Sequence, residues 1–332
     1  MSAVVLSALH GHHPLGFLAA SGALRVATDK VAPCKLAWCL SESIWRASLY
    51  CESLSDDEFT TGLLTAVADE AKSYLACLEA YKITEAEAPL DNFRESGLQA
   101  LRENGCEPAE MALAILPSFG SDLVFRQKGT GKKKKTVIQT TLFAMTSGQQ
   151  DLVPGMRKVA KRLAKRSKNE NVPNEIVETI KEALFGPWRY DDDEHPLGWD
   201  PQVQRLHALR NKAPTNDAQK RSVCGAVFLA TQALPLFPCF AINNRLRTTG
   251  FHRDRNAEDW FAWPIWNEPI SLGTLRTLLA HPHDDLRERG IQTVYRCRRA
   301  PTGGADGDYR IFSSSEEVLV RQGSGRGSTT LS

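Results

Sequence analysis

The sequence predicts an α+β fold in which helices and short strands are mixed, with two subdomains. Segments with apolar residues at helical spacing occur beside short alternating segments, but the two kinds do not alternate regularly as in α/β proteins. The chain has 332 residues, of which 42% are hydrophobic and 24% charged. This composition is typical of globular domains with sizeable cores, and the length corresponds to about two domains.

The N-terminal third shows clear signals for helix starts. Pro14 suits the first position of a helix within residues 9–25, after a tight turn. Ser55 and Glu58 have the spacing of a capping box, which predicts the start of a long helix. Weak alternation favours a strand before it. In order, the expected elements are a helix at 9–25, a strand at 31–40, a helix at 55–81 and a helix at 92–104.

The C-terminal half is predicted from helix ends and short apolar runs. Gly186 and Pro187 end one helix, Pro235 ends another, and Ser271 caps a third. The expected elements are helices at 173–185, 217–234 and 271–280, strands at 246–251 and 291–298, and an acidic, aromatic loop at 186–201.

Charge is distributed unevenly although the formal net charge is only +2. Residues 1–125 carry a net charge of −9, residues 126–168 carry +12 and residues 169–332 carry −1. A concentrated positive segment indicates an anionic partner. We therefore expect four regions: an N-terminal α+β domain (1–125), a basic loop and helix that contact nucleic acid (126–168), a C-terminal α+β domain (169–320) and a disordered tail (321–332).

The basic segment has two parts. Glycines and four consecutive lysines at 129–135 predict an exposed loop between strands at 122–126 and 136–143, without the spacing of a P-loop. Residues 152–168 place cations and an apolar stripe at helical spacing, which predicts a basic amphipathic helix. The candidate phosphate contacts are Lys132, Lys133, Lys134, Lys135, Arg157, Lys158, Lys161, Arg162, Lys165 and Arg166. A solvated face is the alternative; a membrane surface is disfavoured because bulky aromatic residues are absent.

Three clusters contain metal-ligating residue types. They are the turn histidines His10, His12 and His13, the acidic residues 191–195, and residues 281–285. A turn, a solvated loop and a helix end are the favoured interpretations. No nucleophile–base, zinc-protease or dinucleotide-binding motif is present. We therefore expect no catalytic residue, no metal and no cofactor.

The eight cysteines lack CxxC spacing, which favours reduced, buried side chains over zinc or disulfides. No run of 18 apolar residues occurs, and the apolar start of the chain lacks a basic flank. These features predict a cytoplasmic protein. Among the seven tryptophans, Trp260, Trp263 and Trp266 recur every third residue beside prolines. We expect loop anchors with buried indoles; stacking on unpaired bases and a protein interface are the alternatives.

Two segments carry a resemblance to a known family. Residues 9–25 read LHGHHPLGFLAASGALR, and residues 263–269 read WPIWNEP. Together they resemble the large-subunit proteins of type I CRISPR effector complexes, subtype I-U, also called I-G, in a short or variant form. Residues 185–188 (FGPW), 199–201 (WDP) and 249–251 (TGF) are similar to the same wider group.

The resemblance implies a non-catalytic nucleic-acid-binding subunit of a Cascade-like surveillance complex. The implied partners are the CRISPR guide RNA, target DNA, other effector-complex subunits and a separate helicase–nuclease, with no membrane. Such a subunit contacts the nucleic-acid backbone while base pairing reads the sequence. Two other hypotheses stay open: a protein–protein scaffold that docks on acidic partners, and a metal-dependent nuclease built on residues 191–195 or 281–285.

Overall fold

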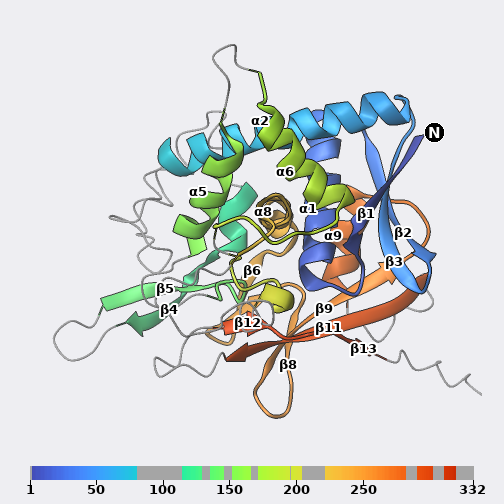
Figure 1. Ribbon diagram of the computed structural model, residues 1–332. Coiled ribbons are helices and arrows are strands. Elements are labelled where there is room, and N and C mark those ends of the chain that lie inside the picture. Colours follow the sequence, from blue (N-terminus) through green and yellow to red (C-terminus); the bar gives the residue numbers. More distant parts are fainter. Residues whose placement is uncertain are drawn as a thin grey trace, which may run out of the picture.

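The computed structural model describes residues 2–80, 114–128, 135–145, 152–165, 171–194, 196–203, 221–281, 290–301 and 310–318. Helices and antiparallel sheets are mixed in these ranges, which confirms the α+β class expected from the sequence. Figure 1 shows the helices gathered at the centre and top of the molecule, with one sheet on their right and a second sheet beneath them. None of the described helices is long and apolar enough to cross a membrane.

The first sheet is antiparallel, with strand order β1-β3-β2-β10. Its strands are β1 (Ser2–His10), β2 (Cys34–Ser41), β3 (Ile44–Cys51) and β10 (Ile270–Ser271). The sequence predicted β2 but neither β1 nor β3. β10 pairs Ile270 with Leu36, so a strand from late in the chain completes the sheet of the N-terminal segment.

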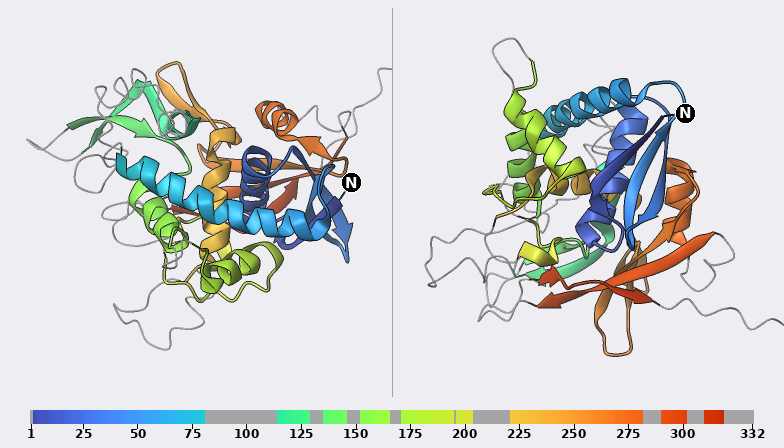
Figure 2. Two further views of the ribbon diagram at one scale, coloured as in Figure 1. Left: turned by 90° about the horizontal axis from the view of Figure 1, so that it is seen from above. Right: turned by 45° about the vertical axis from the view of Figure 1, so that its right-hand side comes forward.

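The two N-terminal helices begin where their capping signals predict. In α1 (Pro14–Lys30), the His13 ring nitrogen Nδ1 accepts a hydrogen bond from the Gly16 amide at 3.4 Å. In α2 (Asp56–Ala80), the Ser55 hydroxyl accepts from the Glu58 amide at 3.4 Å, while the Glu58 carboxylate accepts from the Ser55 amide at 3.0 Å. This reciprocal pair is the predicted capping box. α2 lies across α1, α5 and α6 (Figure 2).

The second sheet has the order β12-β11-β9-β8, with β13 also paired to β11. The strands are β8 (Phe251–Arg253), β9 (Asp259–Trp266), β11 (Ile291–Pro301), β12 (Arg310–Phe312) and β13 (Glu316–Val318). β11 confirms a predicted strand. The loop expected at the three tryptophans is wrong, because pairing with β8 and β11 makes that segment a strand. Trp263 and Trp266 are nevertheless buried, as expected.

Two hairpins lie beside each other (Figure 2). The predicted hairpin is confirmed as β4 (Gly120–Lys128) and β5 (Lys135–Thr140). The other consists of β6 (Cys239–Ile242) and β7 (Arg245–Thr248). The strand predicted at 246–251 is divided between β7 and β8. Gly250 has a φ of +80° at this break, and a Cβ there would approach the rings of Phe261 and Phe237.

Four further helices are α5 (Leu152–Leu163), α6 (Asn174–Phe185), α8 (Cys224–Ala233) and α9 (Leu272–Ala280). Ser271 caps α9 as predicted, accepting from the Thr274 amide at 3.2 Å. α8 starts later than the predicted residue 217: residues 221–223 are extended, and Ser222 pairs with Asp192 in a β-bridge. The predictions for 92–104 and 321–332 lie outside the described residues.

α1 and α8 pack against each other at the centre of one hydrophobic core. A Cβ at Gly22 of α1 would lie 1.8 Å from the Leu229 carbonyl oxygen of α8, so only glycine allows this approach. The core includes Val4 near the start of the chain and Phe312 near the end of the described residues. Both expected α+β segments therefore contribute to the same core.

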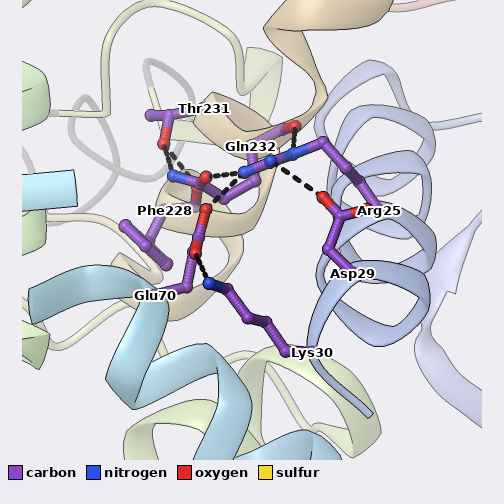
Figure 3. Close-up of polar contacts among 7 residues, drawn as sticks. All are labelled: Arg25, Asp29, Lys30, Glu70, Phe228, Thr231 and Gln232. Carbon is purple, nitrogen blue, oxygen red and sulfur yellow. Dashed lines mark hydrogen bonds and ion pairs between the residues drawn. The ribbon is translucent and has the colours of Figure 1, made fainter. Parts of the chain in front are cut away.

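A buried polar network joins α1, α2 and α8 (Figure 3). The Arg25 guanidinium donates to the Glu70 carboxylate at 2.6 Å and to the Gln232 carbonyl at 2.7 Å. It also donates to the Gln232 side-chain oxygen and, at 3.2 Å, to Asp29. Lys30 Nζ lies 3.8 Å from Glu70. Glu70 and Gln232 are each 1% exposed, so their polar atoms depend on these partners.

Candidate nucleic-acid interface

α5 is the amphipathic helix that the sequence predicts, although it ends at Leu163 rather than at residue 168. Its apolar face packs against α2 and α8. Lys158 and Lys161 are solvent exposed, as is Lys165 just beyond the helix, and Arg157 is half-buried. The buried residues of the helix are Leu152, Val153, Pro154, Gly155, Met156, Val159, Ala160 and Leu163. The core thus holds the exposed lysines on a fixed backbone.

Arg162 differs from the other cations of α5 because it faces the protein. Its side chain is 18% exposed, and its guanidinium donates to Glu175 at 2.5 Å and lies 3.8 Å from Glu194. Burial lowers the pKa of Arg162, but the carboxylates of Glu175, Glu194 and Asp192 outweigh this effect and raise it. The charge of Arg162 is therefore compensated inside the protein.

The acidic loop at 191–194 lies between α5 and α8. The Asp192 carboxylate accepts from the Cys224 amide at 2.7 Å and so satisfies the first turn of α8. Burial raises the pKa of both Asp192 and Glu194. Asp193 faces Arg221 at 3.8 Å. These three carboxylates have different partners, and Asp192 and Glu194 are half-buried, so the loop is not simply solvated as expected. His195 lies outside the described residues.

The predicted basic loop is described only at its edges. Lys132, Lys133, Lys134 and Arg166 lie outside the described residues. β5 begins at Lys135, whose backbone pairs with that of Lys128 on β4. The β4–β5 hairpin and α5 lie on the same side of the molecule in Figures 1 and 2. The strands that flank the predicted basic loop and the helix α5 therefore lie on one side.

The turn histidines have structural partners. His13 caps α1, and its Nε2 lies 3.3 Å from an oxygen of the buried Asp200, although the two are not aligned for a hydrogen bond. The His10 and His12 rings stack with their centroids 5.6 Å apart. His281 ends α9, and residues 282–285 lie outside the described ranges. Within those ranges, no group of three or more His, Cys, Asp or Glu side chains is arranged to hold a metal.

The segments behind the family resemblance meet around the start of α1. The Trp263 indole donates to the Gly11 carbonyl at 2.7 Å, which joins the two main segments. The His13 ring packs edge-on against Trp188 and lies beside Asp200, which belong to two of the shorter segments. These segments are far apart in the sequence but form one packed unit.

The remaining tryptophans and the cysteines behave mainly as core residues. Trp38, Trp199, Trp263 and Trp266 are fully buried, which disfavours base stacking by these four. Trp260 is partly buried beneath the Arg296 guanidinium, 4.4 Å from the ring centroid. Five of the seven described cysteines are buried, as expected, and none of these seven is bonded to another.

The β6–β7 hairpin is a second cationic feature, which the sequence alone did not predict. The β6–β7 hairpin exposes Phe240 and Ile242 on one strand and carries Arg245 and Arg247 on the other. The apolar run before this hairpin predicted only the end of a helix, and two arginines spaced by one residue do not stand out in the composition. The strand predicted at 246–251 included part of β7, but the alternation of Arg245, Leu246 and Arg247 was the available signal that its two arginines share one face.

A comparison of the sequence with protein-family models and with curated proteins finds no match.

Proposed function

We propose that the protein is a non-catalytic nucleic-acid-binding subunit of a type I CRISPR surveillance complex. The observation that carries the nucleic-acid part is α5, whose apolar face is buried in the core while Lys158, Lys161 and Lys165 are exposed. Lysines on a helix that the core already holds in place suit phosphate groups, because the helix does not have to be ordered on binding. The β4–β5 hairpin, whose strands precede and follow the four lysines in the sequence, lies on the same side of the molecule as α5.

The local charge balance supports the same proposal. Glu175 on α6 and Glu194 of the acidic loop compensate Arg162, whereas Lys158, Lys161 and Lys165 of the same segment are solvent exposed. A phosphate backbone would approach this surface, release counterions and bind in a salt-dependent manner. The placement in a CRISPR complex rests on the family resemblance of residues 9–25 and 263–269.

The nucleic-acid part is tested with the purified full-length protein and fluorescent DNA or RNA of mixed sequence. We expect K161E/K165E to weaken binding at least 10-fold at low salt and to flatten its salt dependence. K35E/K181E is the matched control, because it makes the same charge change at exposed lysines of β2 and α6. Equal losses in the two variants, or no loss in either, would reject α5 as the interface.

The assignment to a complex is tested by purifying the tagged protein from its host at moderate salt. Short repeat–spacer RNAs together with further subunits in fixed ratio are the expected result. A stoichiometric protein complex that survives nuclease treatment and contains no RNA would instead support the scaffold hypothesis. Cleavage that depends on Mg²⁺ or Mn²⁺ and is lost on changing the acidic loop would support the nuclease hypothesis.

A further inference from the structure

The β6–β7 hairpin presents an apolar and cationic face to solvent. The register places Phe240 opposite Arg247 and Ile242 opposite Arg245. Directly opposite residues of an antiparallel pair project from the same side of the sheet. Phe240 is 44% exposed and Ile242 is 47% exposed, whereas Leu246, on the other side, is buried. We call the four residues Phe240, Ile242, Arg245 and Arg247 the hairpin face.

Among the described residues, the two arginines of the hairpin face have no acidic partner. In the part of the chain that the structure describes, neither Arg245 nor Arg247 has an ion-pair or hydrogen-bond partner for its guanidinium. Arg245 is exposed and Arg247 is half-buried. Arg162, Arg189, Arg296 and Arg298, in contrast, are all paired with glutamates. Two uncompensated arginines beside a phenylalanine favour a polyanionic partner.

The exposed ring of Phe240 indicates which kind of polyanion would bind the hairpin face. A duplex hides the faces of its bases, so an exposed phenylalanine contributes little to contact with its phosphates. Unpaired bases stack on aromatic side chains, while neighbouring arginines contact the strand's phosphates or stack in turn. β4, which lies beside this hairpin, also exposes two apolar side chains, Leu123 and Phe125.

We propose that the hairpin face binds single-stranded nucleic acid, with Phe240 stacking on a base and Arg245 and Arg247 contacting the backbone. This inference rests on the proposed nucleic-acid function and assigns it a second contact, separate from the lysines of α5. The hairpin face then discriminates single strands from duplexes, whereas α5 attracts both.

The test compares binding of oligothymidylate and of a blunt DNA duplex to the full-length protein at matched salt. We expect F240A to weaken oligothymidylate binding about 5- to 100-fold, the range of one lost base stack, and to leave duplex binding within about twofold. F240Y should retain binding because the ring remains, and F240L should lose it although an apolar side chain remains. R245A/R247A should weaken single-strand binding and lower its salt dependence.

The possible failures are distinguishable. If K161E/K165E weakens binding of both nucleic acids while F240A and F240L alter neither, the hairpin-face inference is wrong and the proposed function stands. If the wild-type protein binds neither nucleic acid, both fail. If F240L binds oligothymidylate like the wild type and F240A instead releases a co-purified subunit, the face is a protein interface and the inference is overturned.

Discussion

The Arg25 guanidinium and the Glu70 carboxylate form an ion pair of 2.6 Å where α1, α2 and α8 meet. The Glu70 side chain is 2% exposed and that of Arg25 is 12% exposed, so both charges are largely removed from water. Gln232 on α8 accepts from the same guanidinium. A buried pair adds little net stability by itself, but each charge becomes costly if its partner is lost.

We therefore expect E70L and R25M to destabilise the protein by about 3–5 kcal/mol each. The double variant R25M/E70L should lose much less than the sum, because it leaves neither charge buried. Urea unfolding followed by tryptophan fluorescence measures these differences. D29N is the control: Asp29 is 43% exposed, and the change should cost less than about 1 kcal/mol. If the double variant loses as much stability as the two single variants together, Arg25 and Glu70 are not coupled.

Close packing of α1 on α8 makes a second prediction. G22A should destabilise the protein by about 3 kcal/mol, because its methyl group would collide with the Leu229 carbonyl. G273A on α9 is the matched control, since a Cβ there meets only the Ser271 hydroxyl at 3.9 Å. The control should be neutral or up to about 1 kcal/mol more stable, because alanine favours helices. Equal urea midpoints for G22A and the wild type would contradict the described helix contact.

Protonation of His10, His12 and His252 predicts a loss of stability in mild acid, although His10 and His252 are only half-buried and His12 is exposed. Burial lowers the pKa of His10, His12 and His252; neighbouring His13 adds to the effect for the first two. Unfolded histidines take up protons near pH 6.5, whereas these rings stay neutral to lower pH in the folded protein. The unfolded state binds more protons, so this contribution to stability is fully present above about pH 6.5 and declines below it.

Urea midpoints at about pH 7.5 and about pH 5.5 measure this decline. Buried carboxyls such as Asp192, whose pKa is raised, act in the opposite direction, so the comparison is made between variants. H12Q should lose less stability than the wild type over this interval. If the urea midpoint of H12Q falls between the two pH values as much as that of the wild type, His12 does not contribute to the decline.

Much of the fold was predictable because local signals decide where helices start. The pattern at Ser55 and Glu58 placed α2, and Pro14 placed α1. β1 was missed because it pairs with β3 at a long separation in the sequence. β3 was missed because it follows β2 in a two-residue turn at Glu42 and Ser43, which have positive φ but lack the usual Asn-Gly or Asp-Gly signal. β9 was missed because prolines and tryptophans suggested a loop, whereas pairing on both sides makes it a strand.

The candidate site was predictable only in part. Spacing identified the exposed lysines of α5, since their side of the helix is set by the apolar residues between them. Spacing could not show that Arg162 is compensated, because Glu175 and Glu194 reach it from another helix and from the acidic loop. The hairpin face was also missed, because Phe240 and Arg247 become neighbours only through strand register.

Lys161 and Arg162 are adjacent, but we expect Lys161 to contribute to nucleic-acid binding and Arg162 to contribute to stability. R162M should cost about 1 kcal/mol, since it removes a partly exposed ion pair, and should leave the salt dependence of nucleic-acid binding unchanged. K161M should leave the urea midpoint unchanged. It should also reduce the slope of log affinity against log salt by the amount that corresponds to about one phosphate contact. Both variants remove one charge from adjacent positions, so each controls for the other. If R162M lowers the salt slope as much as K161M, the Arg162 charge reaches the nucleic acid and the acidic loop does not compensate it.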